Sequence, residues 1–94
     1  MKTTLTAEEM FKVLKYQKIK SIKKNIINII YLNETNENHC KLIMFNRYKT
    51  EKIQVSITEY FIENNKKIFI KQPTIDSNEV MAINKQIEEL EVWW

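Results

Sequence analysis

The stretch IQVSITEYF, residues 53–61, has the period of a β-strand with one buried face. Apolar residues occupy every second position from Ile53 to Ile57, and polar residues lie between them. Because successive side chains of a strand point to opposite faces, this pattern predicts one face toward a core and one toward water. A sheet with an apolar face needs a second layer to cover it, so the flanking segments decide the fold.

Three further segments have the composition of strands, being rich in β-branched and aromatic residues and separated by polar loops. They are IINIIYL at 26–32, CKLIMF at 40–45 and KKIFIK at 66–71. Asn64 and Asn65 predict a two-residue hairpin turn before the last of these, because asparagine tolerates a positive φ and the chain has no glycine. Consecutive strands of this kind predict an antiparallel meander.

Helix-start signals lie on both sides of these strands. In LTAEEM, residues 5–10, Thr6 is the expected N-cap and Glu9 completes a capping box. In IDSNEV, residues 75–80, Asp76 and Glu79 hold the same two positions. After the second cap, apolar residues recur with the spacing of one helical face. They are Val80, Ile83, Ile87 and Leu90.

Length and composition bound the architecture. The chain has 94 residues, of which 44% are hydrophobic and 29% charged, as expected for a single globular domain over residues 1–94. Its longest apolar runs, such as residues 42–45, are far shorter than the ~20 residues that cross a bilayer. We therefore predict an α+β fold without membrane contact, in which an N-terminal helix and a C-terminal helix pack on one face of a four-stranded antiparallel β-meander.

The expected location is the cytoplasm. The first residues contain no apolar segment typical of a signal peptide. Cys40 is the single cysteine and has no partner for an internal disulfide, which agrees with a reducing compartment.

Few residues offer catalytic or metal-binding chemistry. Without glycine, the chain lacks the loops that hold phosphates in many nucleotide enzymes. His39 and Cys40 are adjacent, but neighbours on a strand point apart, and a structural zinc site needs about four such ligands. A metal shared across a homodimer is the alternative for this pair. We predict no catalytic residue, no metal site, no cofactor and no enzyme activity.

Charge is unevenly distributed along the chain. Residues 10–33 carry six lysines and no acid, whereas residues 76–94 carry five acids and one lysine. A dense basic segment can neutralise phosphates, with a tyrosine nearby to stack on a base. Alternatively, the lysines are ordinary solvated residues or face the acidic last helix. The nucleic-acid-binding candidates are Lys12, Lys15, Tyr16, Lys18, Lys20, Lys23 and Lys24.

The chain ends in ELEVWW, which places Trp93 and Trp94 at its last two positions. The helical stripe continues from Leu90 to position 94, so one ring is expected to cover the core. The other ring is then a candidate anchor for a protein partner or for a second copy of the chain. An exposed sheet edge is a further surface on which a partner can bind.

Two terminal motifs resemble those of a small protein family from Firmicutes genomes and their prophages. These motifs are LTAEEMFKVL and AINKQIEELEVWW, and the usual family patterns are LTAEEMFEELGYE and ITMEELKAINKQVEELGW. Lys15 replaces the glycine that follows the first helix in the family, and the terminus departs from its Leu-Gly-Trp ending. The resemblance implies a phage-type context and no assigned activity.

These observations favour a non-catalytic, phage-type protein that acts by binding a macromolecular partner. The expected role is to inhibit or modify a host or defence factor. The alternative is a nucleic-acid-binding module that uses the basic segment from Lys12 to Lys24. A homodimer is compatible with either role.

Overall fold

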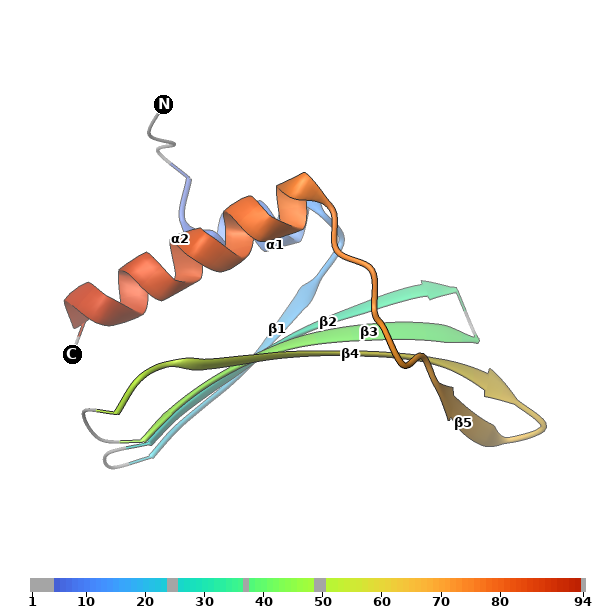
Figure 1. The fold of residues 1–94 in the computed structure, drawn as a ribbon. Coiled ribbons are helices and arrows are strands. Elements are labelled where there is room, and N and C mark those ends of the chain that lie inside the picture. Colours follow the sequence, from blue (N-terminus) through green and yellow to red (C-terminus); the bar gives the residue numbers. More distant parts are fainter. Residues whose placement is uncertain (1–4, 24–25, 37, 49–50, 94) are drawn as a thin grey trace.

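The computed structural model describes residues 5–23, 26–36, 38–48 and 51–93. In chain order these residues form α1 (Ala7–Val13), β1 (Gln17–Lys23), β2 (Ile26–Asn36), β3 (His39–Tyr48), β4 (Gln54–Glu63), β5 (Lys66–Phe69) and α2 (Ser77–Trp93). Each strand pairs antiparallel with the next, so the sheet order is β1-β2-β3-β4-β5. The helices contact each other and lie on the same side of the sheet (Figure 1). The predicted α+β meander with both helices on one face is confirmed.

The described part of the chain contains five strands, so the prediction of four was wrong. The additional strand is β1, whose sequence QKIKSIK was interpreted only as a basic segment. It pairs along its whole length with β2, from Gln17 opposite Leu32 to Lys23 opposite Ile26. Lysine is common on edge strands because it discourages pairing with another chain, which explains this composition.

Both predicted helix starts are confirmed. The Thr6 hydroxyl accepts a hydrogen bond from Glu9 N at 3.2 Å, and the Glu9 carboxylate accepts one from Thr6 N at 2.9 Å. Before α2, Asp76 Oδ1 accepts from Glu79 N at 2.8 Å and Glu79 Oε1 accepts from Asp76 N at 3.0 Å. Each pair satisfies backbone N–H groups that have no partner within the helix.

α1 ends where Lys15 adopts a positive φ of 70°. Tyr16 N donates to Phe11 O at 2.9 Å and Lys15 N donates to Lys12 O at 3.0 Å, which together form a Schellman motif. The Phe11 and Tyr16 rings meet edge to face at 5.4 Å and supply its hydrophobic contact. Lys15 therefore occupies a left-handed position that glycine adopts more easily, and it is the position at which the resembled family has glycine.

The hydrophobic core lies between the helices and the central strands. Fully buried Phe11 of α1 stacks on Tyr31 of β2 at 3.8 Å, and Phe45 of β3 packs against both rings. The Tyr31 hydroxyl donates to buried Gln86 Oε1 of α2 at 2.5 Å. Neither helix of the described chain has the length and apolar character of a membrane span.

The buried face of α2 differs by one position from the prediction. Ile83 and Leu90 are buried and Ile87 is half-buried, as expected, but Val80 is 41% exposed. Its neighbour Glu79 points inward instead, toward polar partners beneath the helix. Because the Glu79 carboxylate points inward, Val80, the first residue of the predicted apolar stripe, faces solvent and not the core.

Two contacts tie the helices to one another and to the sheet. Ala7 N at the start of α1 donates to the Glu89 carboxylate of α2 at 2.7 Å. Arg47 of β3 donates from Nη1 to Leu90 O at 3.1 Å, near the end of α2. A carboxylate at a helix start and a guanidinium at a helix end both complement the helix dipole.

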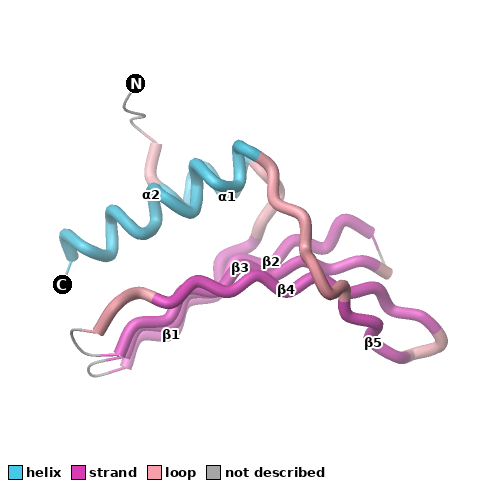
Figure 2. The backbone as a smooth tube through the Cα atoms, in the orientation of Figure 1, coloured by secondary structure: helices cyan, strands magenta, loops and turns pink. Residues whose placement is uncertain are grey.

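The β4–β5 hairpin extends past the ends of the helices (Figure 2). Asn64 and Asn65 form its turn with φ values of 52° and 62°, so the predicted asparagine turn is confirmed. All four residues of β5 are exposed. β5 forms one edge of the sheet and β1 forms the other.

Candidate functional site

Two regions of the molecule are candidates for function: the sheet face that the helices leave uncovered, and a polar cleft at the start of α2. The uncovered face, here called the open face, consists of the odd positions of β1 and β5 and the even positions of β2, β3 and β4. The alternate positions of β2 and β3 carry the core residues and face the helices.

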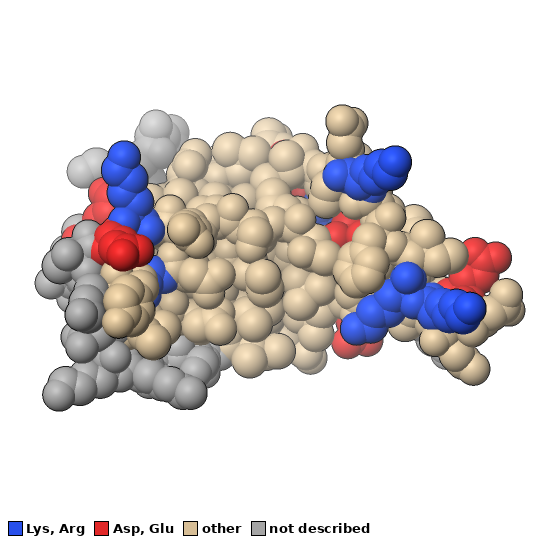
Figure 3. Space-filling view, turned by 60° about the horizontal axis from the view of Figure 1, so that its bottom comes forward, with Lys and Arg blue, Asp and Glu red and all other residues tan. Residues whose placement is uncertain are grey.

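The centre of the open face is apolar. The register places Ile19, Ile30 and Met44 in one row across β1, β2 and β3, and Leu32 and Leu42 in the next row. Ile19 is 51% exposed and the other four side chains are half-buried by their neighbours in the sheet. In the oblique view of Figure 3, the described charged residues gather toward the two ends and leave a broad uncharged area between them.

Aromatic residues extend this surface toward β5. The rings of Tyr60 and Phe69 lie 5.5 Å apart, and the Lys67 ammonium lies 4.9 Å from the centre of the Tyr60 ring. Phe69 is 60% exposed. Cys40, which pairs with Tyr60 across β3 and β4, is buried.

A sequence signal for the open face exists in the unbroken apolar runs 29–32 and 42–45. A strand with one wet face alternates apolar and polar residues, whereas an unbroken run is typical of a strand with two apolar faces. The runs therefore indicate a second apolar face as well as the positions of the strands.

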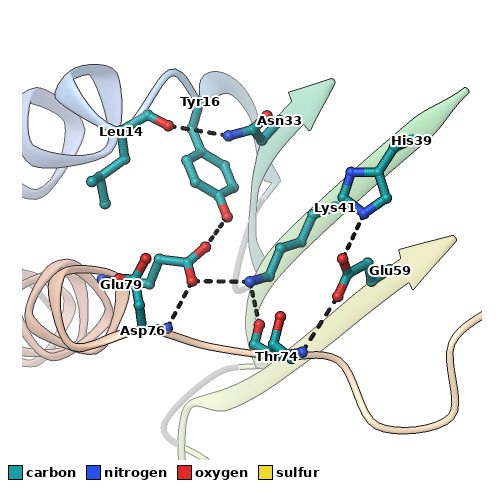
Figure 4. A network of polar contacts seen from close by, with 9 residues as sticks. All are labelled: Leu14, Tyr16, Asn33, His39, Lys41, Glu59, Thr74, Asp76 and Glu79. Atoms are coloured by element: carbon teal, nitrogen blue, oxygen red, sulfur yellow. Dashed lines mark hydrogen bonds and ion pairs between the residues drawn. The ribbon is translucent and has the colours of Figure 1, made fainter. Parts of the chain in front are cut away.

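The second candidate is a polar cleft of about 370 Å³. Figure 4 shows its polar side chains pointing toward one another from strands of the sheet, from the residues that follow α1 and from the start of α2. The cleft is lined by Leu14, Tyr16, Asn33, His39, Lys41, Glu59, Thr74, Ile75, Asp76 and Glu79.

An ion pair lies at the centre of this cleft. Lys41 Nζ donates to Glu79 Oε1 at 2.9 Å, and each residue is only 7% exposed. Lys41 also donates to the Thr74 carbonyl, and the Tyr16 hydroxyl donates to Glu79 Oε2. Because buried charges are stable only when paired and hydrogen-bonded, these contacts explain how both groups remain under the helix.

The pKa values of this cluster shift in opposite directions. Burial alone would raise the pKa of Glu79, but hydrogen bonds from Tyr16, from the Asp76 backbone and from Lys41 outweigh it and hold the pKa below its usual value. Burial and the adjacent Glu79 carboxylate raise the pKa of Tyr16 above its ordinary range. The carboxylate is therefore ionised and the phenol neutral at physiological pH.

A second pair lies on the other side of Thr74. His39 Nε2 is 2.5 Å from Glu59 Oε2, and Glu59 Oε1 accepts from Thr74 N at 3.3 Å. The His39 ring also contacts Phe61, with centroids 4.7 Å apart. The segment between β5 and α2 is thus held through both the N–H and the carbonyl of Thr74.

The polar groups of the cleft are engaged mainly with one another. Both carboxylate oxygens of Glu79 and of Glu59 form hydrogen bonds or ion pairs with other residues of the chain. A network satisfied in this way rigidifies and specifies the packing around it. Among the described residues, no three His, Cys, Asp or Glu side chains are grouped so that they could hold a metal ion.

The residues of this network were only partly visible in the sequence. Glu79 was assigned its capping role, but its partner Lys41 lies 38 positions away in the chain. A signal was available for Lys41: with Ile43 and Phe45 it occupies alternate positions of β3 on the buried face. A lysine at such a position indicates a buried partner of opposite charge.

Four of the seven nucleic-acid candidates come together in the structure. Lys12, Lys15, Tyr16 and Lys18 line one surface pocket of about 430 Å³, together with Glu8 and others. Lys18 pairs with Glu8 at 3.0 Å. Tyr16, however, is 5% exposed and bonded to Glu79, so its ring is not placed to stack on a base.

The remaining candidates fall partly outside the described residues. The backbone places Lys20 and Lys23 on β1, but their side chains and all of Lys24 are outside the described part of the chain. Trp93 is the last residue of α2, and its side chain, like all of Trp94, is also outside it. The predicted roles of both tryptophans therefore stay predictions.

No family model, curated protein or solved structure matches this chain. The relation to the Firmicutes and prophage family therefore stays a prediction from the terminal motifs, and the functional argument rests on the geometry of the open face and the polar cleft.

Proposed function

We propose that this is a non-catalytic protein that acts by binding a macromolecular partner through the open face of its sheet. The observation that carries the proposal is an apolar, centrally uncharged sheet surface on the side away from the helices. Large contiguous apolar patches are uncommon on monomeric proteins, because they gain free energy by leaving water, and they commonly mark interaction surfaces.

The strand edges are less suited to binding another protein. Edge strand β1 carries Lys18 and edge strand β5 carries Lys66 and Lys67. Lysines on an edge oppose strand-to-strand addition, because a second chain would have to approach or bury their charges. The face is therefore preferred over the edges as the binding surface.

The proposed targets are host or defence factors, inhibited or modified by being bound. This part of the proposal is supported by the phage-type context that the terminal motifs imply. A non-catalytic role is supported by the polar cleft, where Lys41, Glu59 and Glu79 are engaged with other groups of the protein.

A pull-down from host lysate tests the proposal with variants of matched chemistry. Ile19→Lys puts a charge on the open face, and Val13→Lys puts the same charge on α1, where Val13 is 70% exposed. We expect wild type and Val13→Lys to capture a protein that survives nuclease treatment and that Ile19→Lys loses. Equal capture by both variants would contradict binding through the open face.

A nucleic-acid-binding role is the second candidate, favoured by the position of Lys12, Lys15 and Lys18 around one surface pocket. It predicts affinity for DNA or RNA oligonucleotides that falls steeply between about 50 and 200 mM salt, because bound phosphates release counterions. Fluorescence anisotropy with Lys12→Gln/Lys15→Gln as the weakened variant measures this. Absence of binding at low salt would eliminate this candidate.

A further inference from the structure

We infer that the open face binds a second copy of this chain, so that two sheets pack face to face with the helices outside. This inference rests on the proposed function, in that it names the partner of the same surface. The resulting dimer is a four-layer arrangement of helices, sheet, sheet and helices, related by a two-fold axis.

The composition of the surface favours a copy of itself. The five central apolar residues are Ile19, Ile30, Leu32, Leu42 and Met44. The cross-strand rows that contain them are completed by Gln17, Ser56 and Thr58, none of which is charged. The central rows of two such surfaces bring no like charges together, although the whole chain has a net charge of +3.

The same composition disfavours nucleic acid as the occupant of this face. Affinity for nucleic acid comes mainly from Lys and Arg side chains that neutralise phosphates, and the central rows contain neither. The apolar residues lose contact with water most completely against another apolar surface, which an identical face supplies.

The size of the face matches a stable interface. The molecule measures 43 × 32 × 20 Å, and Figure 1 shows its long axis running along the strands and its layers stacked in the plane of the picture. The shortest dimension therefore lies across the five strands, which are spaced about 4.8 Å apart. A face with the longest and the shortest of these dimensions offers at most roughly 850 Å², compared with about 800 Å² per partner in a standard interface. Two identical sheets also share the same twist, so they can pack aligned at a spacing of about 10 Å.

The distribution of charge has the character of an interface. In Figure 3 the described charged residues lie toward the ends of the molecule, around an uncharged middle. Interfaces commonly have an apolar centre that excludes water and a polar rim that stays solvated. Glu34 at one end of the face and Tyr48 at the other would form parts of this rim.

Light scattering after gel filtration tests the inference on the full chain. Wild type at about 100 µM is expected to elute as a dimer, because an interface of standard size gives a dissociation constant in the micromolar range or tighter. Met44→Lys at the centre of the face is expected to weaken dimerisation at least about 30-fold, the effect of losing a well-buried interface residue. Met81→Lys on α2, where Met81 is 54% exposed, is the matched control and is expected to stay dimeric.

Small-angle scattering identifies the mode of association. A face-to-face dimer extends the molecule across its layers and leaves the width across the strands near 20 Å. Dimers paired through the β1 or β5 edges would instead widen the sheet across the strands from 20 Å to about 40 Å without thickening the layers, and that outcome would overturn the inference. A dimer that Met44→Lys leaves intact would overturn it as well.

Separate measurements distinguish a variant that fails to fold, a failure of this inference and a failure of the proposed function. Circular dichroism reports whether Met44→Lys folds, and Ile30→Thr, which keeps a β-branched side chain, replaces it if it does not. Wild type that is monomeric at about 100 µM overturns the inference about the second copy. Binding of another protein through the open face would then still be decided by the pull-down with Ile19→Lys and Val13→Lys.

Discussion

Consecutive residues of β3 enter two different environments. Ile43 and Phe45 are fully buried beneath the helices, whereas Leu42 and Met44 lie on the open face and remain half-buried. All four are large apolar residues, so their hydrophobicity does not explain why only one face is covered. The two sides of this sheet are therefore distinguished by polar residues at their margins.

Charged residues usually lie on exposed surfaces, but in this sheet the covered side holds charges and the centre of the open side holds none. The covered side holds Lys41, Glu59 and Glu79, all buried and paired. The open side has uncharged rows at its centre. Directional polar pairing fixes how α2 and the segment before it lie on the sheet, whereas apolar contacts are non-directional and can be made with another molecule.

The largest effect is expected from breaking the buried ion pair. Lys41→Met leaves Glu79 charged and buried without its cation, which should lower the free energy of unfolding by about 3–5 kcal/mol. Chemical denaturation measures this, with Lys52→Met, an exposed lysine, as the control. A change below about 1 kcal/mol for Lys41→Met would show that the pair does not hold the covered face.

Truncations on opposite faces of β3 compare the two sides directly. Ile43→Ala creates a cavity in the core and is expected to cost about 3 kcal/mol. Leu42→Ala removes a half-buried side chain and is expected to cost about 1 kcal/mol in the monomer. If a second copy covers the open face, the cost of Leu42→Ala grows with protein concentration and that of Ile43→Ala does not.

Acid is expected to loosen the covered side first. Because the pKa of Glu79 is lower in the folded protein than its usual value, its contribution to stability is present above that usual value. It is lost as the pH falls through the lower, folded-state pKa. Denaturation midpoints measured from pH 7 downward should therefore decrease in acid, and Glu79→Gln should flatten this decrease.

Glu9 is the matched control for Glu79. It has the same capping position in α1 and its pKa is also lowered, first by the Thr6 backbone N–H, but it is exposed. Glutamine keeps the capping geometry at both sites. If Glu9→Gln flattened the acid limb as strongly as Glu79→Gln, burial of the ion pair would not be the cause.

The smallest effect concerns the end of α1. Lys15→Gly relieves the left-handed conformation at φ 70° and is expected to raise the free energy of unfolding by up to about 1 kcal/mol. The gain is limited because glycine also has more conformational freedom in the unfolded state. Thermal unfolding measures it. Lys12→Gly, within α1, should instead destabilise by about 1 kcal/mol.

The local features of this protein can be predicted from its sequence. Two capping boxes, an asparagine hairpin turn and the order of four strands could be predicted because each depends on residues close together in the chain. β1 was missed because the four lysine and glutamine residues among its seven concealed Ile19 and Ile22. An edge strand tolerates this composition, since one of its sides has no neighbouring strand.

The choice of the apolar face that the helices cover depends on contacts between segments that are distant in the chain. Both faces of the central strands are apolar in sequence, so the pattern allows either choice. The choice is fixed by contacts between distant segments, such as Lys41 with Glu79 and His39 with Glu59. Such pairs form only when the fold brings them together, because polar groups far apart in the chain have no interaction that a local pattern can reveal.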